Sequence, residues 1–263
     1  MSSKASHPNI SVARDGHTSV VTLERPEKFN AITLSMWRAL AEIVGQLGED
    51  AETRSIVLTG AGANFSVGAD ISEFAVERST EEKARAYERA VDACCDAIFS
   101  APKPTFAAVR GFCLGGGCAV AMSCDFRIAE EASVFGIPAA KISIVYGVKA
   151  TQKLLALVGL ANAKRILFTG HRFPATEALA AGLVDEIVPD AMEAVLARAT
   201  AINANAPLSV AGAKTILNGL AFGLGALEAA AADAAIKRAA ASEDFREGQR
   251  AFADRRAPAF TGR

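Results

Sequence analysis

The chain has 263 residues, of which 51% are hydrophobic and 22% charged, a composition that excludes a disordered or collagen-like protein. Its 28 Lys and Arg against 29 Asp and Glu leave a net charge of −1, so the basic excess typical of nucleic-acid binding is absent. No run of about 18 uncharged apolar residues occurs, and the N-terminus lacks the apolar segment of a signal peptide. We therefore expect a cytoplasmic protein with neither nucleic acid nor membrane as partner.

The five cysteines are odd in number, form no C-x-x-C pair and stand mostly in apolar segments. We expect them to be reduced core residues. Neither a metal site nor a bound cofactor is predicted from them.

The first part of the chain alternates strand-like and helix-like segments. β-branched residues predict strands over 19–23 and 55–59. Each is followed by a Pro-containing or Gly-rich segment that ends the strand. Between them, from Thr33 to about residue 47, apolar residues recur at a spacing of three and four. This spacing predicts an amphipathic helix with Thr33 as its N-cap.

Further along, a strand over 105–109, a helix ending near Met122 and a strand over 126–129 are predicted in turn. Helical spacing follows from 152 to 168, broken at Gly159, and residues 176–188 predict a short helix and then a strand.

After residue 190 the sequence becomes Ala-rich, with almost no β-branched runs, and helical spacing dominates. We therefore divide the chain into a core over residues 1–190 and a C-terminal helical region over 191–263 that serves oligomerisation.

The strongest local signal is the triple glycine Gly115-Gly116-Gly117, which follows a strand and begins a helix. Glycine lets a ligand approach the backbone closely, and the first N–H groups of a helix are unpaired donors at the positive end of the helix dipole. Such a turn can hold an anion or stabilise a developing oxyanion. The alternative is a tight turn required only for packing.

The second signal is the segment from Asn64 to Ile71, which follows the predicted strand over 55–59. A dinucleotide-binding fingerprint would need a third glycine where Phe65 stands. A nucleophile elbow centred on Ser66 lacks its first glycine and has only His171 downstream, so an esterase remains a minor alternative.

Taken together, the two segments belong to a series of motifs that covers nearly the whole chain. In chain order these are LERPEKFNA from Leu23, IVLTG from Ile56, FSVGADI from Phe65, PKPT from Pro102, Gly111, LGGGC from Leu114, CD from Cys124, FGIP from Phe135, LFTG from Leu167, EA from Glu177, GLV from Gly182, SED from Ser242, EG from Glu247 and AF from Ala251. By their order and spacing, the chain resembles the crotonase superfamily, also called the enoyl-CoA hydratase/isomerase superfamily.

The resemblance implies an α/β fold, a crotonase-like spiral of ββα units with a C-terminal helical trimerisation region. It also implies a homotrimer or a hexamer built as a dimer of trimers, and an acyl-CoA substrate whose coenzyme A is part of the substrate and not a cofactor. The family's oxyanion hole would be formed here by the backbone N–H groups of Val67 and Gly116, which can stabilise a thioester enolate.

The resemblance also implies a coenzyme A binding region. Its members in this sequence would be Lys28, Ala31, Ala69, Asp70 and Ile71, with Arg255 of the last predicted helix near the phosphates. A solvated helix charge is the alternative interpretation of Arg255. For Asp70 and Asp125 we expect a role in fixing loops or helix ends.

The sequence departs from the family at its two acid/base positions. Hydratases of the family carry one glutamate two residues after the triple glycine and another directly after the Phe-Gly-x-Pro motif; here these positions are Ala119 and Ala139. Alanine cannot transfer a proton, so the usual two-glutamate hydration is not expected.

Tyr146 is the best remaining candidate for a catalytic side chain. A tyrosine near this position occurs in the family's decarboxylases, where loss of CO₂ generates the enolate, although that branch has a histidine where Ala69 stands.

We expect an acyl-CoA-processing enzyme of hydratase/isomerase type. The alternatives are a decarboxylase or other lyase that uses Tyr146, and a non-catalytic acyl-CoA-binding protein; Glu73 and Lys141 are the next side chains to consider.

Overall fold

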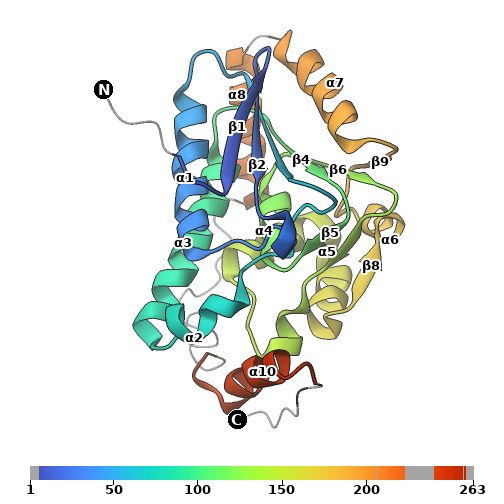
Figure 1. Cartoon of the computed structure of the whole chain (residues 1–263). Helices are drawn as coiled ribbons and strands as arrows, with labels where there is room; N and C mark the ends of the chain where they lie inside the picture. The colour runs from blue at the N-terminus through green and yellow to red at the C-terminus, as the bar shows by residue number, and fades with distance from the viewer. Residues whose placement is uncertain (1–5, 206, 223–239, 257, 259–263) are drawn as a thin grey trace.

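The computed structural model describes residues 6–205, 207–222, 240–256 and 258 as two sheets surrounded by helices (Figure 1). The larger sheet has six strands in the order β1-β2-β3-β4-β6-β9. Their bounds are Ile10–Asp15, Thr18–Leu23, Ser55–Gly60, Thr105–Val109, Phe126–Glu130 and Glu186–Val188. Strand β1 pairs antiparallel with β2, and the other neighbours pair in parallel. All the strands predicted from sequence are present; β1, which has one buried residue in six, was not predicted.

The smaller sheet has the order β5-β7-β8, with bounds Phe112–Leu114, Val134–Gly136 and Arg172–Pro174. Strand β5 pairs in parallel with β7, and β7 pairs antiparallel with β8. Strand β5 leads directly into the triple-glycine turn, so this sheet holds the turn in place.

Helices cover both faces of the larger sheet, with α1 (Leu34–Glu49) and α3 (Glu81–Ser100) on one side and α7 (Ala191–Asn203) on the other (Figure 1). Successive residues of a strand point to opposite faces, which explains the division. In β3, Ile56 and Leu58 join the main core, whereas Val57 packs with Val195 and Ala199 of α7.

Helix α1 begins as predicted at Thr33, whose hydroxyl accepts a hydrogen bond from the Met36 N–H at 3.2 Å. Such a cap satisfies one of the unpaired donors at a helix start. Trp37 and Leu40 of this helix are fully buried. Helix α1 therefore supplies a rigid wall behind the glycine turn.

Of the remaining helical segments, the predicted helix broken at Gly159 is present, whereas α3 and the short helical segments over 26–28, 71–77 and 138–142 are not predicted from the sequence. Helix α5 (Val148–Thr169) is interrupted at Gly159, where φ is +70° and the helical geometry is broken. The others are η1 (Pro26–Lys28), η2 (Ile71–Glu73), α2 (Phe74–Glu77), α4 (Gly116–Ser123), η3 (Pro138–Ile142), α6 (Ala175–Ala180), α8 (Pro207–Phe222) and α10 (Glu243–Ala253).

The predicted C-terminal helical region is described over α7, α8 and α10, and its residues 223–239 lie outside the described part. The division of the chain at residue 190 stays a prediction, although α7 packs directly on the larger sheet.

In the part of the chain that the structure describes, no helix is long and apolar enough to span a membrane. The five cysteines are buried and form no disulfide bond.

Candidate active site

The two segments expected to bind coenzyme A lie side by side. Ile32 forms a parallel bridge with Ala69, donating its N–H to the Gly68 carbonyl at 2.8 Å and accepting from the Asp70 N–H at 2.9 Å. The structure thus brings Ala31, Ala69, Asp70 and Ile71 together.

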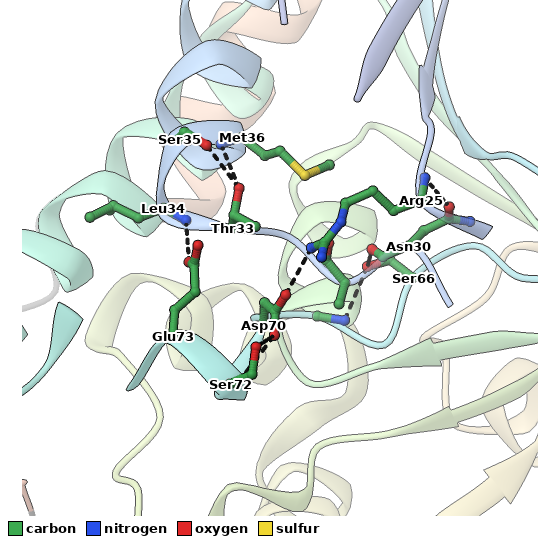
Figure 2. A network of polar contacts seen from close by, with 12 residues as sticks. Arg25, Asn30, Thr33, Leu34, Ser35, Met36, Ser66, Asp70, Ser72 and Glu73 are labelled. Carbon is green, nitrogen blue, oxygen red and sulfur yellow. Dashed lines mark hydrogen bonds and ion pairs between the residues drawn. The ribbon is translucent and has the colours of Figure 1, made fainter. Parts of the chain in front are cut away.

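An ion pair ties these segments to the end of β2. One nitrogen of Arg25 lies 2.9 Å from a carboxylate oxygen of Asp70 and 2.8 Å from the Ala31 carbonyl oxygen (Figure 2). Burial alone would raise the pKa of Asp70, but hydrogen bonds from Ser72 and Arg25 outweigh it, and the pKa is lowered. Asp70 therefore fixes the loop as an anion, as expected from the sequence.

Two other polar side chains of this region form hydrogen bonds with the backbone. Glu73 accepts a hydrogen bond from the Leu34 N–H at 2.9 Å, so its carboxylate caps the start of α1 (Figure 2). Ser66 is fully buried and donates to the Asn30 carbonyl at 2.7 Å. A buried serine with its hydroxyl committed to the backbone is not placed to act as an esterase nucleophile.

The loop at Gly68 and the turn at Gly116 are in direct contact. Gly68 has a φ of +87°, and a Cβ built on it would lie 2.4 Å from the Gly116 nitrogen. A Cβ on Gly116 would lie 3.2 Å from the Ala69 nitrogen and 3.0 Å from Cζ2 of Trp37. At position 68 only glycine permits this approach, which brings the backbone nitrogens of Ala69 and Gly116 close to each other.

The expectation that Val67 supplies an oxyanion donor needs correction. The Val67 N–H donates to the Phe29 carbonyl at 3.1 Å and is therefore occupied. In the parallel bridge, the flanking residues of Ala69 bond to Ile32, so the N–H of Ala69 points away from that strand. Among the described residues, neither this N–H nor that of Gly116 has an acceptor. We therefore assign the pair of free donors to Ala69 and Gly116.

Tyr146 lies at the same turn, as predicted. Its hydroxyl donates a hydrogen bond to the Gly115 carbonyl at 3.1 Å, next to the Gly116 N–H. Burial raises the pKa of Tyr146 well above its usual value, and the neighbouring Cys118 and Cys95 act in the same direction. Tyr146 is therefore a neutral hydrogen-bond donor at neutral pH and not a base.

Ala119 and Ala139, the two positions where the resemblance led us to look for glutamates, both lie in packed surroundings. Ala119 is 2% exposed and packs in a small cluster with Cys95, Ala150 and Tyr146. Ala139 is partly buried in η3 and packs against the main core. Neither position offers a group that moves a proton.

Three other basic residues named from the sequence lie outside the turn. Lys28 is exposed at the end of η1, on the segment that contacts the 66–71 loop. Arg255 is exposed after α10, with a φ of +53°, and no described hydrogen bond or ion pair joins it to the other expected binding residues. Lys141 is exposed in η3.

Sequence reasoning missed the support beneath the glycine turn. Trp37 donates its indole N–H to the Tyr87 hydroxyl at 3.2 Å, and both side chains are buried. The three-four spacing marks Trp37 only as one apolar position of the predicted helix, and no sequence pattern singles out Tyr87. The sequence offered one signal for both residues, their rarity, since the chain has one Trp and two Tyr.

Comparisons with known proteins identify the family of this chain. Residues 14–263 match the model of the enoyl-CoA hydratase/isomerase family. The short-chain-enoyl-CoA hydratase of Clostridium acetobutylicum is 38% identical over 213 residues, 80% of this chain and 81% of that protein. This chain belongs to the enoyl-CoA hydratase/isomerase family.

Solved structures show the same fold. An enoyl-CoA hydratase from Bacillus anthracis superposes with a TM-score of 0.77 at 33% identity, over 97% of this chain and 100% of that chain. Methylmalonyl-CoA decarboxylase in complex with 2-nitronate-propionyl-CoA superposes with a TM-score of 0.87 at 25% identity, over 98% and 100% of the two chains. The architecture of two sheets and surrounding helices is thus the crotonase fold.

Proposed function

We propose that this protein is an enzyme that binds an acyl group as its coenzyme A thioester and stabilises the enolate of that thioester. The thioester oxygen would accept hydrogen bonds from the N–H groups of Ala69 and Gly116. Two pre-positioned backbone donors stabilise negative charge that develops on such an oxygen during reaction. Their adjacency, with no acceptor among the described residues, is the observation that supports the site.

We further propose that the enolate forms by loss of CO₂ and not by removal of an α-proton. Hydration and isomerisation require groups that take up and release protons, and Ala119 and Ala139 provide none. In decarboxylation the bond from the α-carbon to the carboxylate breaks, and its electron pair forms the enolate without a base. Tyr146, whose single O–H now bonds to the Gly115 carbonyl, would exchange that bond for one to the carboxylate of the substrate.

Coenzyme A would lie along the paired segments of Lys28, Ala31, Ala69, Asp70 and Ile71, held in shape by Arg25. Arg255 would approach its phosphates. We propose a cytoplasmic homotrimer or hexamer, in keeping with the family, with coenzyme A as part of the substrate and no separate cofactor.

The test compares two substrates on the same enzyme preparation. Release of CO₂ from methylmalonyl-CoA is measured against hydration of crotonyl-CoA, followed as loss of the absorbance of the conjugated thioester. We expect CO₂ release at least about a hundredfold faster than hydration, the order of effect that acid/base groups supply. Hydration at a comparable or higher rate would contradict the decarboxylase assignment. Tight binding of both thioesters without turnover of either would indicate a non-catalytic acyl-CoA-binding protein.

A further inference from the structure

Helix α3 carries a row of carboxylates next to the residues that pack with Tyr146. Glu88, Asp92 and Asp96 recur at every fourth residue, a spacing that places side chains on one face of a helix. Between them, Val91 and Cys95 pack with Tyr146 in the cluster that contains Ala119. This face of α3 therefore borders the position where hydratases of the family carry their first glutamate.

The carboxylates on either side of Asp92 are paired with cations. Glu88 forms an ion pair with Arg78 at 2.6 Å, and Asp96 forms one with Lys149.

The buried Lys153 is engaged as well, donating to the Cys95 carbonyl at 3.2 Å and to the Ser123 hydroxyl at 3.0 Å. In contrast, no hydrogen bond or ion pair to the Asp92 carboxylate is found among the described residues.

Asp92 also lies beside the backbone of the tyrosine segment. A Cβ built on Gly147, the residue after Tyr146, would be in van der Waals contact with an Asp92 carboxylate oxygen at 3.8 Å. The side chain is partly buried. Within the described part of the chain it is thus a carboxyl group without a hydrogen-bond or ion-pair partner, at the edge of the cluster that contains Tyr146 and Ala119.

The surroundings of Asp92 favour its protonated form. Burial is the main cause that raises its pKa, and the neighbouring charges of Glu88 and Asp96 act in the same direction. Lys149 and Lys153, which face it from α5, oppose the shift without cancelling it. A larger share of Asp92 therefore carries a proton near neutral pH than an exposed aspartate would.

We propose that Asp92 is the proton donor of this site and transfers its proton to the α-carbon of the thioester enolate. The inference rests on the proposed enolate chemistry, because an enolate left by loss of CO₂ must gain one proton to become the product. In this step the enolate electron pair forms the new C–H bond, the Asp92 O–H bond breaks, and the carboxylate then recovers a proton from water. Ala119 and Ala139 carry no acidic proton, and the phenol of Tyr146 is a much weaker acid than the carboxyl group of Asp92.

The test follows the proton independently of CO₂ release. By microscopic reversibility, a group that protonates the α-carbon also removes a proton from it, so the enzyme should exchange α-protons of propionyl-CoA in D₂O. Exchange is measured by proton NMR for the wild type, Asp92→Asn and the matched control Asp96→Asn, which changes the same group one helical turn away. Methylmalonyl-CoA decarboxylation is measured in parallel.

We expect Asp92→Asn to slow exchange at least about a hundredfold, within the range for loss of a general acid, while Asp96→Asn exchanges within about threefold of wild type. Exchange at the wild-type rate in folded Asp92→Asn would overturn the proposal, and so would a wild type that exchanges no α-protons. Exchange that depends on Asp92 in a wild type that releases no CO₂ would support the proton donor and refute the decarboxylase assignment.

A pH profile separates proton donation from a structural role. Exchange of propionyl-CoA begins with removal of an α-proton, which needs the carboxylate form of Asp92, so the Asp92-dependent exchange rate should rise as pH rises through the raised pKa of Asp92. This rise should be absent in Asp92→Asn. In Asp96→Asn it should persist but move to lower pH, because one of the negative charges that raise the pKa of Asp92 is gone.

Discussion

Gly68 lies against Gly116 so closely that a Cβ on Gly68 would come within 2.4 Å of the Gly116 nitrogen and 2.7 Å of the Leu114 carbonyl oxygen. Both atoms belong to the backbone and cannot swing aside. The loop that carries Ala69 and the turn that carries Gly116 therefore have one relative position, and a glycine at 68 maintains it.

The substitution Gly68→Ala should destabilise the protein by about 2–4 kcal/mol, because it combines a steric clash with a positive φ. The matched control is Gly16→Ala, where φ is +55° but nothing lies within 4 Å of the added Cβ. That change should cost only about 1–2 kcal/mol, the strain of the left-handed backbone. Urea unfolding of both variants measures the difference; equal losses would show that the contact with Gly116 is unimportant.

Removing the hydroxyl of Tyr146 should impair catalysis but not folding. Tyr146→Phe keeps the ring in its cluster with Ala119 and Cys95 and deletes the hydrogen bond to Gly115. A loss of about tenfold in the rate of CO₂ release, equivalent to about 1.4 kcal/mol in the barrier, is expected with little change in melting temperature. A Tyr146→Phe variant with the wild-type rate would remove Tyr146 from the mechanism.

The ion pair between Arg25 and Asp70 should contribute stability in a pH-dependent way. The folded-state pKa of Asp70 lies below its usual value of 3.8, so this contribution is present above that value and is lost as pH falls through the folded-state pKa. Asp70→Asn should therefore be less stable than the wild type by about 1–3 kcal/mol at neutral pH. The two proteins should converge in denaturant titrations as pH falls through the folded-state pKa of Asp70. A gap that does not depend on pH would argue against the ion pair as its cause.

Most of the strands and helices could be predicted from local patterns. The strand β3 and the helix α1 have strong signals, since β-branched residues, three-four spacing and the Thr33 cap all act within a few residues. Strand β1 was missed because it lies at the sheet edge, where five of its six residues face solvent and no alternation of apolar residues marks it.

The site was predicted only in part, because its geometry depends on contacts between distant segments. The triple glycine predicted a helix start, and α4 begins at Gly116. The choice between Val67 and Ala69 required knowing that Phe29 accepts the Val67 N–H, a contact that spacing along the chain does not reveal. The position of Asp92 beside Gly147 likewise results from the packing of α3 against the segment that leads into α5.

The central claim, that Ala69 and Gly116 stabilise a thioester enolate, is tested most directly by binding of an enolate-like ligand. We would measure Kd by calorimetry for 2-nitronate-propionyl-CoA and for propionyl-CoA, with the wild type, Gly116→Pro and Gly116→Ala. Proline removes the N–H at the first position of α4 and adds a Cβ close to Trp37. Alanine adds a Cβ at the same place, 3.0 Å from Cζ2 of Trp37, but keeps the N–H, so it is the matched control.

The wild type should bind the nitronate at least about a hundredfold more tightly than propionyl-CoA, as an enzyme binds a mimic of its reactive intermediate. This preference should fall to less than about tenfold in Gly116→Pro and persist in Gly116→Ala, since only the former lacks the donor. Equal affinity of the wild type for the two ligands, or an undiminished preference in Gly116→Pro, would contradict the claim.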